Sequence, residues 1–312
     1  MCGCSKLRNN GEAPTIWILG STSFSSNFVL LAGKALYPKA KIIGFQRSLR
    51  VSAGFDFVYS GSSNLEEKLS AALVAFPPNY IINLVGKRPP GSRDSIWYAN
   101  SDVSNNLFNF LLSSKYFNAR ILTVGSAAEY LQKSGGLFSE DDPIGGVNVY
   151  GAAKSYTTNL VQTLYKKSEL KIMIARPFNL IGPRLHGNGV VSDIITQVIG
   201  GNACVRVGDL TAIRDFVDVR DAARAYYLIL NSGLASEVYN VCTGEGTSIE
   251  RVVQIVERAL GKSIPIIQDK NLFRKKEINS VVGENKKLLC IGEWVPKYSV
   301  EKTISEIVDS CK

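Results

Sequence analysis

The feature that most constrains the fold is a continuous apolar run, Thr15–Leu19, which leads into a turn of small residues and then into a helical pattern. Such a run is typical of a strand buried on both faces, as in a parallel sheet. A strand, a small-residue turn and a helix in this order hold the pyrophosphate of a dinucleotide in α/β proteins. Gly20 is the only glycine of the turn, and Ser23 and Ser26 stand where further glycines are expected. By itself, the motif therefore also fits an ordinary strand–helix connection.

The same alternation continues through the first half of the chain. Strand patterns are predicted at residues 41–45, 55–59, 80–85, 119–124 and 171–175, and helical patterns at residues 65–75, 103–114 and 152–167. Alternating strands and helices predict βαβ units and an α/β fold with a doubly wound parallel sheet. Beyond Pro177 the alternation loosens and Gly, Pro and Asn become frequent, which predicts a smaller second lobe built partly from loops.

Composition and charge exclude several classes of protein. Of the 312 residues 45% are hydrophobic and 20% charged, which is typical of a globular chain. The 36 Lys and Arg exceed the 27 Asp and Glu by nine, but they are spread along the chain, so we expect no nucleic-acid partner. No apolar run approaches the roughly 18 residues that cross a membrane, and the short polar start has no secretory character. We therefore expect a cytoplasmic protein with no membrane partner.

The six cysteines are few and scattered, and His186 is the only histidine. This pattern lacks the spacing of a Cys/His zinc site, so we expect no metal. The thiols of a cytosolic protein are expected to be reduced. The sequence leaves the role of Cys2 and Cys4 open.

Tyr150 and Lys154 form the strongest chemical motif. They lie one turn apart at the start of a predicted helix, so both side chains point to the same side. A phenol has a reference pKa of about 10 and exchanges protons poorly at neutral pH unless a nearby cation favours the phenolate. Lys154 supplies that cation, and Ser126, at the end of the strand predicted upstream, can donate a hydrogen bond to the same substrate oxygen. A Tyr–Lys pair alone is common on solvated helices, but together with Ser126 and the N-terminal turn it predicts a proton-transfer site.

These residues resemble the extended short-chain dehydrogenases/reductases that modify sugar nucleotides, over nearly all of the chain after Thr15. The N-terminal turn is similar to that family's glycine-rich turn, Ser126, Tyr150 and Lys154 match its catalytic triad, and Asn100 matches an Asn of its fourth crossover helix. Three further segments together resemble most closely the reductases that act on GDP-4-keto-6-deoxymannose. They are residues 175–183 (ARPFNLIGP), residues 214–221 (RDFVDVRD) and the closing segment at residues 282–297.

The resemblance implies a Rossmann fold with a smaller α/β substrate-binding lobe. We expect a flexible tail over residues 1–13 and an NAD(P)-binding Rossmann domain formed by residues 14–177 and 215–243. The substrate-binding lobe would comprise residues 178–214 and 244–312. A homodimer is also expected.

The resemblance further implies roles residue by residue. Tyr150 would be the general acid/base, Lys154 would hold the nicotinamide ribose and lower the pKa of Tyr150, and Ser126 would orient the reacting oxygen. The substrate would contact Ser126, Asn179, Arg214 and Arg274; a planar guanidinium suits phosphate because it offers paired donors. The expected cofactor-binding residues are Gly20, Thr22, Ser23, Phe24, Arg47, Ser48, Leu84, Val85, Asn100, Tyr150, Lys154 and Pro177.

Departures from the family pattern argue against one of the family's reactions, the elimination of water. Dehydratases of the family place an Asp–Glu pair directly after the catalytic Ser or Thr, where this chain has Ala127 and Ala128, which transfer no protons. Glu129 follows one position late and would point the other way in an extended segment. Leu180 replaces a histidine that is common in the closest reductases, and we expect the loop residue His186 to be exposed and without function.

The residues after the second predicted strand bear on the choice of dinucleotide. NAD-selective folds place an Asp or Glu there, which binds the ribose 2′-hydroxyl and repels a 2′-phosphate. This chain has the segment QRSLR at residues 46–50, with no acid. Arg47 can pair with the phosphate and Ser48 can add a hydrogen bond, so NADP(H) is the preferred cofactor and NAD(H) the alternative.

The sequence therefore predicts an NADP(H)-dependent oxidoreductase that acts on a nucleoside-diphosphate sugar, with a GDP-linked 4-keto-6-deoxy sugar favoured and reduction as the direction. An epimerase with the same Ser–Tyr–Lys chemistry is the alternative among enzymes. A non-catalytic NAD(P)-binding sensor is the alternative from another class. The sequence leaves the base, the sugar and the stereochemistry of the product open.

Overall fold

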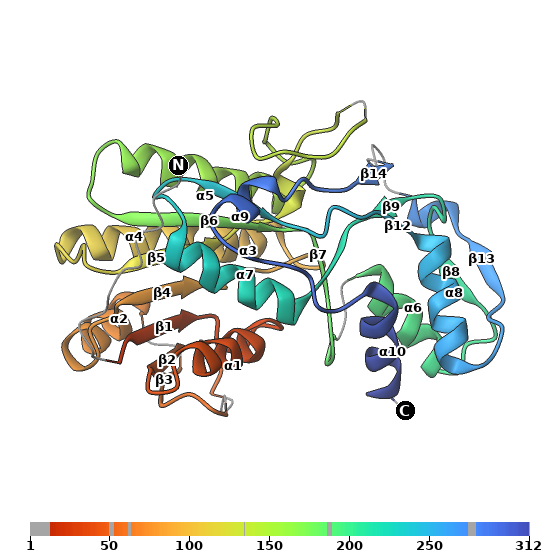
Figure 1. Cartoon of the computed structure of the whole chain (residues 1–312), viewed down its shortest axis with the longest axis horizontal. Helices are drawn as coiled ribbons and strands as arrows, with labels where there is room; N and C mark the ends of the chain where they lie inside the picture. The colour runs from red at the N-terminus through yellow and green to blue at the C-terminus, as the bar shows by residue number, and fades with distance from the viewer. Residues whose placement is uncertain are drawn as a thin grey trace.

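A seven-stranded parallel sheet forms the centre of the computed structural model, which describes residues 13–49, 53–61, 64–133, 135–185, 189–273 and 279–311 (Figure 1). The strand order is β3-β2-β1-β4-β5-β6-β11. The strands are β1 Thr15–Leu19, β2 Lys41–Phe45, β3 Phe57–Tyr59, β4 Tyr80–Asn83, β5 Arg120–Val124, β6 Lys171–Pro177 and β11 Val238–Val241. The order reverses between β1 and β4, which confirms the predicted doubly wound Rossmann sheet.

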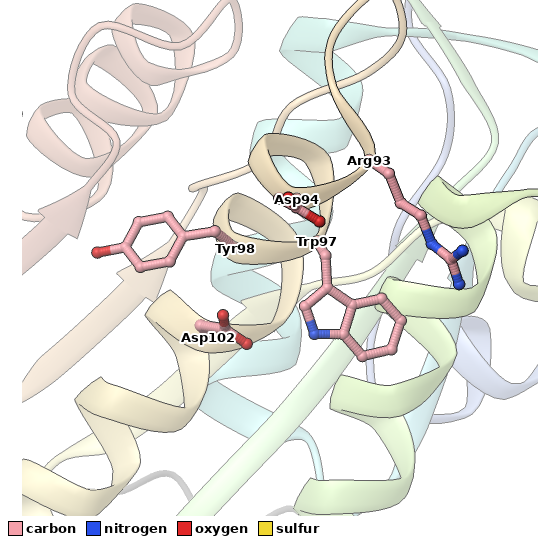
Figure 2. A pocket seen from close by; sticks show the side chains of 5 residues that line it. All are labelled: Arg93, Asp94, Trp97, Tyr98 and Asp102. Atoms are coloured by element: carbon pink, nitrogen blue, oxygen red, sulfur yellow. The ribbon is translucent and has the colours of Figure 1, made fainter.

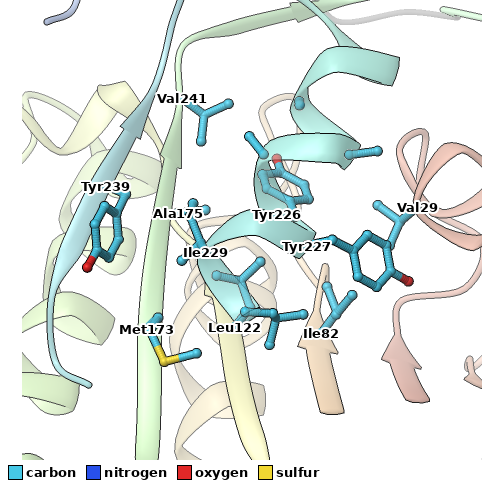
Figure 3. Close-up of a cluster of buried hydrophobic side chains, with 14 of the residues drawn as sticks. Val29, Ile82, Leu122, Met173, Ala175, Tyr226, Tyr227, Ile229, Tyr239 and Val241 are labelled. Atoms are coloured by element: carbon cyan, nitrogen blue, oxygen red, sulfur yellow. The ribbon is translucent and has the colours of Figure 1, made fainter. Parts of the chain in front are cut away.

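The two faces of the sheet bury different side chains, because successive residues of a strand point to opposite sides. Ile16 and Ile18 pack in one core, and Trp17 and Leu19 pack in another. Helices α1 (Ser26–Leu36) and α7 (Val219–Ser232) cover the first face, part of which is shown in Figure 3. Helices α2 (Leu65–Ala75), α4 (Val103–Ser113) and α5 (Val149–Tyr165) cover the second. Covering both faces explains why the strands read as continuous apolar runs.

Two helical segments depart from the sequence-based expectation. A short helix α3 (Arg93–Trp97) and a π-helical turn (Tyr98–Asp102) precede α4 without a break. Ser92 starts α3, because its hydroxyl accepts a hydrogen bond from the Ser95 amide at 3.2 Å. Helix α5 begins at Val149, three residues earlier than predicted, because the Asn148 side chain caps it by accepting from the Gly151 amide at 3.0 Å.

The second half of the chain builds a third core of its own. It is formed mainly by helices α6 (Val190–Ile199), α8 (Ile249–Leu260) and α10 (Val300–Asp309). Short strand pairings join or border these helices: β7 Asn179–Ile181 with β10 Phe216–Asp218, β8 Val205–Val207 with β13 Ile266–Gln268, and β9 Ile213–Arg214 with β12 Thr247–Ser248 and β14 Ser280–Val281. Helix α9 (Lys286–Cys290) lies beside β11, and Ala127–Glu129 and Lys270–Leu272 are single 3-10 turns. None of the described helices is long and apolar enough to span a membrane.

Two buried carboxylates near the start of α7 tie the C-terminal segment to the sheet domain. Asp218 caps α7 and accepts a hydrogen bond from the Thr303 hydroxyl of α10 at 2.7 Å. Asp221 is fully buried and accepts from the amides of Lys297 at 2.8 Å and Tyr298 at 3.1 Å. Arg224 also pairs with Asp221. The start of α7 is therefore held to α10 and to the segment before it by polar contacts.

Replacing Asp221 by Ala should lower the free energy of unfolding by roughly 2–4 kcal/mol, because two amides and a guanidinium lose their buried acceptor. Glu301→Ala is the matched control: it removes an ion pair to Arg251 in which both side chains are exposed, so its loss should stay below about 1 kcal/mol. Urea unfolding followed by circular dichroism measures both. Equal losses for the two variants would contradict the anchoring role of Asp221.

Candidate active site

The turn after β1 lies where the strand order reverses, which is where doubly wound sheets bind ligands. Gly20 has φ +81°, and a Cβ atom there would lie 3.1 Å from the backbone of Leu84 and Val85 at the end of β4. Only glycine fits this conformation and this close approach without strain. The structure thus brings together three of the predicted cofactor-binding residues.

Two serines stand in the turn where glycines were expected, and one of them stabilises the turn by hydrogen bonds. The Ser26 hydroxyl donates to the carbonyl oxygens of Ser21 at 2.7 Å and Ser23 at 2.8 Å, so it ties the turn together. The Ser23 Oγ atom is buried without a hydrogen-bond partner among the described residues. No side chain caps the start of α1, and its first turn holds no acidic residue. An orphaned hydroxyl beside an uncapped helix N-terminus fits the pyrophosphate of a dinucleotide.

The other predicted residues of this region lie around the turn. Thr22 is exposed, and Phe24 is half-buried with its ring 6.0 Å from that of Phe28. Arg47, which follows β2, is exposed and Ser48 is half-buried.

Gln46, for which the sequence suggested no role, connects these two segments. Its side chain accepts from the Ser21 hydroxyl at 2.8 Å and donates to the Ser48 carbonyl at 2.7 Å. This contact fixes the loop that carries Arg47 and Ser48 against the turn after β1.

The predicted catalytic residues lie together: Ser126 follows the end of β5, and Tyr150 and Lys154 lie at the start of α5. Tyr150 is in the first turn of α5, close enough to Ser126 for that side chain to contribute to lowering the pKa of its hydroxyl. The Lys154 ammonium donates to the Val124 carbonyl at 2.7 Å. A Cβ atom at Gly151 would lie 2.2 Å from the Ala128 carbonyl oxygen, so this glycine lets α5 approach the turn that carries Ser126.

Burial and charge act in opposite directions on the two titratable groups. Burial favours the neutral phenol of Tyr150, but the charges of Lys154 and Arg88 and the hydrogen bonds from Ser126 and Arg88 outweigh it and lower the pKa of Tyr150. Burial lowers the pKa of Lys154, and Tyr150 and Glu129 counteract part of this effect. The arrangement makes Tyr150 a better proton-exchanging group than an isolated tyrosine.

Asn100 lies in the π-helical turn and supports the loop after β4. Its side chain accepts from the Lys87 amide at 3.3 Å and donates to the Lys87 carbonyl at 2.8 Å, and its backbone carbonyl accepts from the Thr157 hydroxyl of α5 at 2.9 Å. A Cβ atom at Gly86 would lie 2.9 Å from Asn100 Oδ1 and 3.4 Å from Lys154 Nζ. Asn100 therefore lies beside Lys154.

Glu129 points into the protein interior, although its segment is a 3-10 turn and not the extended strand on which that prediction was based. Its fully buried carboxylate accepts from the Ser126 amide at 2.8 Å and from the Thr158 hydroxyl at 2.7 Å. It also pairs with the buried Arg176 at 3.0 Å. Glu129 is therefore a structural anchor for Ser126, and the positions of a dehydratase acid pair are held by Ala127 and Ala128.

The residues predicted to bind substrate form a second group. The amide and the side chain of Asn179 both donate to the Asp215 carbonyl, at 3.0 and 3.1 Å. The neighbouring Arg214 donates to the carbonyls of Ile213 at 2.7 Å and Asn279 at 3.0 Å. Asp215 itself is buried and accepts from the amides of Thr243 and Gly244 at 2.9 Å, which fixes this corner of the fold.

Pro177, predicted to contact the cofactor, is buried at the end of β6. Arg274, predicted to bind substrate, lies outside the described residues, as do His186, Cys2 and Cys4.

A surface hollow of about 450 Å³ lies beside this site and is lined by Arg93, Asp94, Trp97, Tyr98 and Asp102 (Figure 2). A neighbouring hollow of about 530 Å³ extends from Arg93 and Trp97 to the start of α5. Neither is lined by Ser126, Tyr150 or Lys154.

This arrangement of strand ends, turn and Tyr–Lys helix is that of the extended short-chain dehydrogenases/reductases. The sequence model of the NAD dependent epimerase/dehydratase family matches residues 6–242. The chain therefore belongs to the NAD dependent epimerase/dehydratase family, as its motifs predicted.

Individual relatives include both reductases and epimerases. The chain is 30% identical to GDP-6-deoxy-D-mannose reductase of Pseudomonas aeruginosa over 144 residues, which are 44% of this chain and about half (47%) of that enzyme. It is 26% identical to UDP-glucose 4-epimerase 2 of Arabidopsis thaliana over 251 residues, 73% of this chain and 71% of that enzyme.

Solved structures share the fold. RMD from Pseudomonas aeruginosa complexed with NADPH has a TM-score of 0.80 at 22% identity, over 96% of this chain and 98% of that one. The UDP-glucose 4-epimerase of Thermus thermophilus in complex with NAD has a TM-score of 0.81 at 22% identity, over 95% of this chain and 98% of that one.

Replacing Glu129 by Gln should lower the free energy of unfolding by roughly 3–5 kcal/mol, because the buried guanidinium of Arg176 loses its counter-charge. Lys286→Ala, which removes the ion pair of an exposed lysine with the half-buried Glu284, is the control and should change little. Chemical unfolding measures both variants. If Glu129→Gln kept full stability and lost only activity, Glu129 would be an acid of the reaction and not an anchor.

Proposed function

We propose that this protein is an NADP(H)-dependent oxidoreductase that reduces a 4-keto-6-deoxy sugar carried on a nucleoside diphosphate, with GDP as the favoured nucleotide. The observation that carries the proposal is the position of Tyr150 beside Ser126 and the cation Lys154, which both act to lower the pKa of its hydroxyl. Ser126 is followed by Ala127 and Ala128, which transfer no protons. A hydroxyl that exchanges one proton suffices for carbonyl reduction, whereas elimination of water needs further acids and bases. The partial similarity to GDP-6-deoxy-D-mannose reductase favours the same substrate class.

Each residue has one role in this proposal. When bound, the nicotinamide supplies the hydride. Tyr150 donates the proton to the carbonyl oxygen of the sugar, and Ser126 orients that oxygen. Lys154 favours the phenolate that remains and holds the cofactor ribose. Asn100 supports the loop beside Lys154.

The substrate-binding side is assigned to the second group of residues. We propose that residues 178–214 and 244–312, around the third core, form the lobe that binds the nucleoside diphosphate. Asn179 and Arg214 would contact its phosphates, and Arg274 would add a further cation. Residues 14–177 and 215–243 would form the cofactor domain. As the family resemblance implies, we propose that two copies form a homodimer.

Tyr150→Phe should lower kcat by roughly 10²–10⁴-fold, because the ring remains while the proton donor is lost. Turnover is measured as oxidation of NADPH in the presence of GDP-4-keto-6-deoxy-D-mannose. Tyr156→Phe is the matched control, since Tyr156 is an exposed tyrosine of the same helix and its substitution should leave kcat unchanged. Near-normal turnover by Tyr150→Phe would remove Tyr150 from the mechanism.

A 4-epimerase is the alternative that the similarity to UDP-glucose 4-epimerases favours. Such an enzyme returns the hydride to the same sugar and consumes no net cofactor. Interconversion of UDP-glucose and UDP-galactose without added NADPH would support it, whereas stoichiometric oxidation of NADPH supports the reductase. Binding of NADPH without turnover of any sugar nucleotide would instead support the non-catalytic sensor.

NADPH should bind roughly ten- to more than a hundredfold more tightly than NADH, because a charge-assisted contact from Arg47 to the 2′-phosphate is worth about 1.5–3 kcal/mol. Arg47→Ala should remove most of this preference. Lys39→Ala is the matched control, because Lys39 is an exposed cation at the other end of β2. Fluorescence titration of both cofactors at one ionic strength measures the affinities. Equal affinities in the unmodified protein, or a preference that survives the loss of Arg47, would contradict the assignment.

A further inference from the structure

Lys68 is a buried cation whose hydrogen-bond partners are neutral. It lies one turn into α2 and only 7% of its surface is exposed, although lysine is seldom buried unless it is paired with an acid. Its ammonium donates to the Gln46 carbonyl at 3.1 Å and to the Gly61 carbonyl. No carboxylate among the described residues pairs with it, and burial lowers the pKa of the ammonium. Such a charge costs stability, the more so near the positively polarised start of a helix.

The two carbonyls belong to the segments that follow neighbouring strands. Gln46 comes directly after β2, and Gly61 lies two residues beyond β3. Because β2 and β3 pair in parallel, their carboxyl ends lie side by side. One ammonium therefore joins two loops at the edge of the sheet where doubly wound folds bind their ligands.

Gln46 transmits this contact to the loop that carries Arg47 and Ser48. Its backbone amide donates to the Tyr59 carbonyl at 3.0 Å, and its backbone carbonyl accepts from Lys68. Its side chain joins the turn after β1 to the Ser48 carbonyl. The residue immediately before Arg47 is thus held through both its main chain and its side chain.

We propose that Lys68 is a positioning residue for cofactor selectivity, whose ammonium holds the loop after β2 so that Arg47 reaches the 2′-phosphate of NADP(H). The proposal rests on the NADP(H) preference proposed above and adds a residue that lies outside the segment at residues 46–50. Lys68 is buried and Arg47 is exposed, so Lys68 acts through the loop while Arg47 contacts the phosphate. A loop that is fixed beforehand favours binding, because less freedom is lost when the charged contact forms.

Cofactor binding tests this role without sugar or turnover. Lys68→Met removes the ammonium and keeps an apolar chain of similar length. It should reduce the preference for NADPH over NADH by about tenfold, because the charged contact of Arg47 loses its fixed geometry. The affinity for NADH should change much less, since NADH has no 2′-phosphate. Fluorescence titration of both cofactors at one ionic strength measures the affinities, and Lys68→Arg, which keeps a cation, should retain most of the preference.

Arg120→Met is the matched control. Arg120 is a half-buried cation at the start of β5, and its guanidinium likewise donates to two backbone carbonyls, those of Leu230 and Gly233. Its loss should lower the thermal unfolding temperature and leave the preference for NADPH unchanged, because it lies at the amino end of its strand. A purely structural role of Lys68 would give the same result as this control.

A double-mutant cycle shows whether Lys68 acts through Arg47. In the Arg47→Ala protein, Lys68→Met should change the remaining preference little, because the group that it positions is gone. Equal effects of Lys68→Met with and without Arg47 would overturn the positioning role.

The remaining outcomes separate this proposal from the cofactor assignment. An unchanged preference in Lys68→Met, together with its loss in Arg47→Ala, would overturn the role of Lys68 and leave the NADP(H) assignment standing. Equal affinities in the unmodified protein would overturn both. If Lys68→Met did not fold, Lys68→Gln, which keeps an uncharged donor, should lose the preference that Lys68→Arg retains, and the same preference in these two variants would overturn the proposal.

Discussion

The geometry of the site depends on one buried carboxylate, that of Glu129. It accepts hydrogen bonds from the Ser126 amide and from Thr158 of α5, and it pairs with Arg176 of β6. Three elements that are distant along the chain therefore meet at one charge. A buried ion pair is stable only when its geometry is well satisfied, so these contacts leave little freedom for the turn that carries Ser126. The same contacts fix the distance between that turn and α5, on which Tyr150 and Lys154 lie.

Much of the fold was predictable because its signals are local. The bounds of β1, β2 and α2 agree with the sequence patterns, because the apolar pattern of a buried strand or of a helix can be recognised from consecutive residues. The helical segment before α4 was not predictable. Besides the Ser92 cap, it holds Asn100, whose side chain donates to the carbonyls of Lys87 and Ile96, and the pattern of residue types carries no information about such contacts.

In the candidate active site, too, residues set by local spacing were predictable and contacts between distant segments were not. Tyr150 and Lys154 were predictable because both lie on one helix, where spacing determines the face they share. The support that Asn100 gives to the loop after β4 was not, because its contacts with Lys87 depend on the path of that loop. Gln46 was missed for a similar reason, since its partner Ser21 belongs to a different strand–turn unit. The roles in binding and catalysis remain predictions, while the positions of the described residues are structural facts.

The exposure of Arg47 has a consequence for ligands that are still in solution. Arg47 lies on the loop that Gln46 fixes against the turn after β1, and the chain as a whole has a net charge of +9. A cation at the entrance of a site attracts anions before any contact is made, and dissolved salt weakens this attraction. A phosphate-bearing ligand is therefore attracted from solution toward the turn after β1.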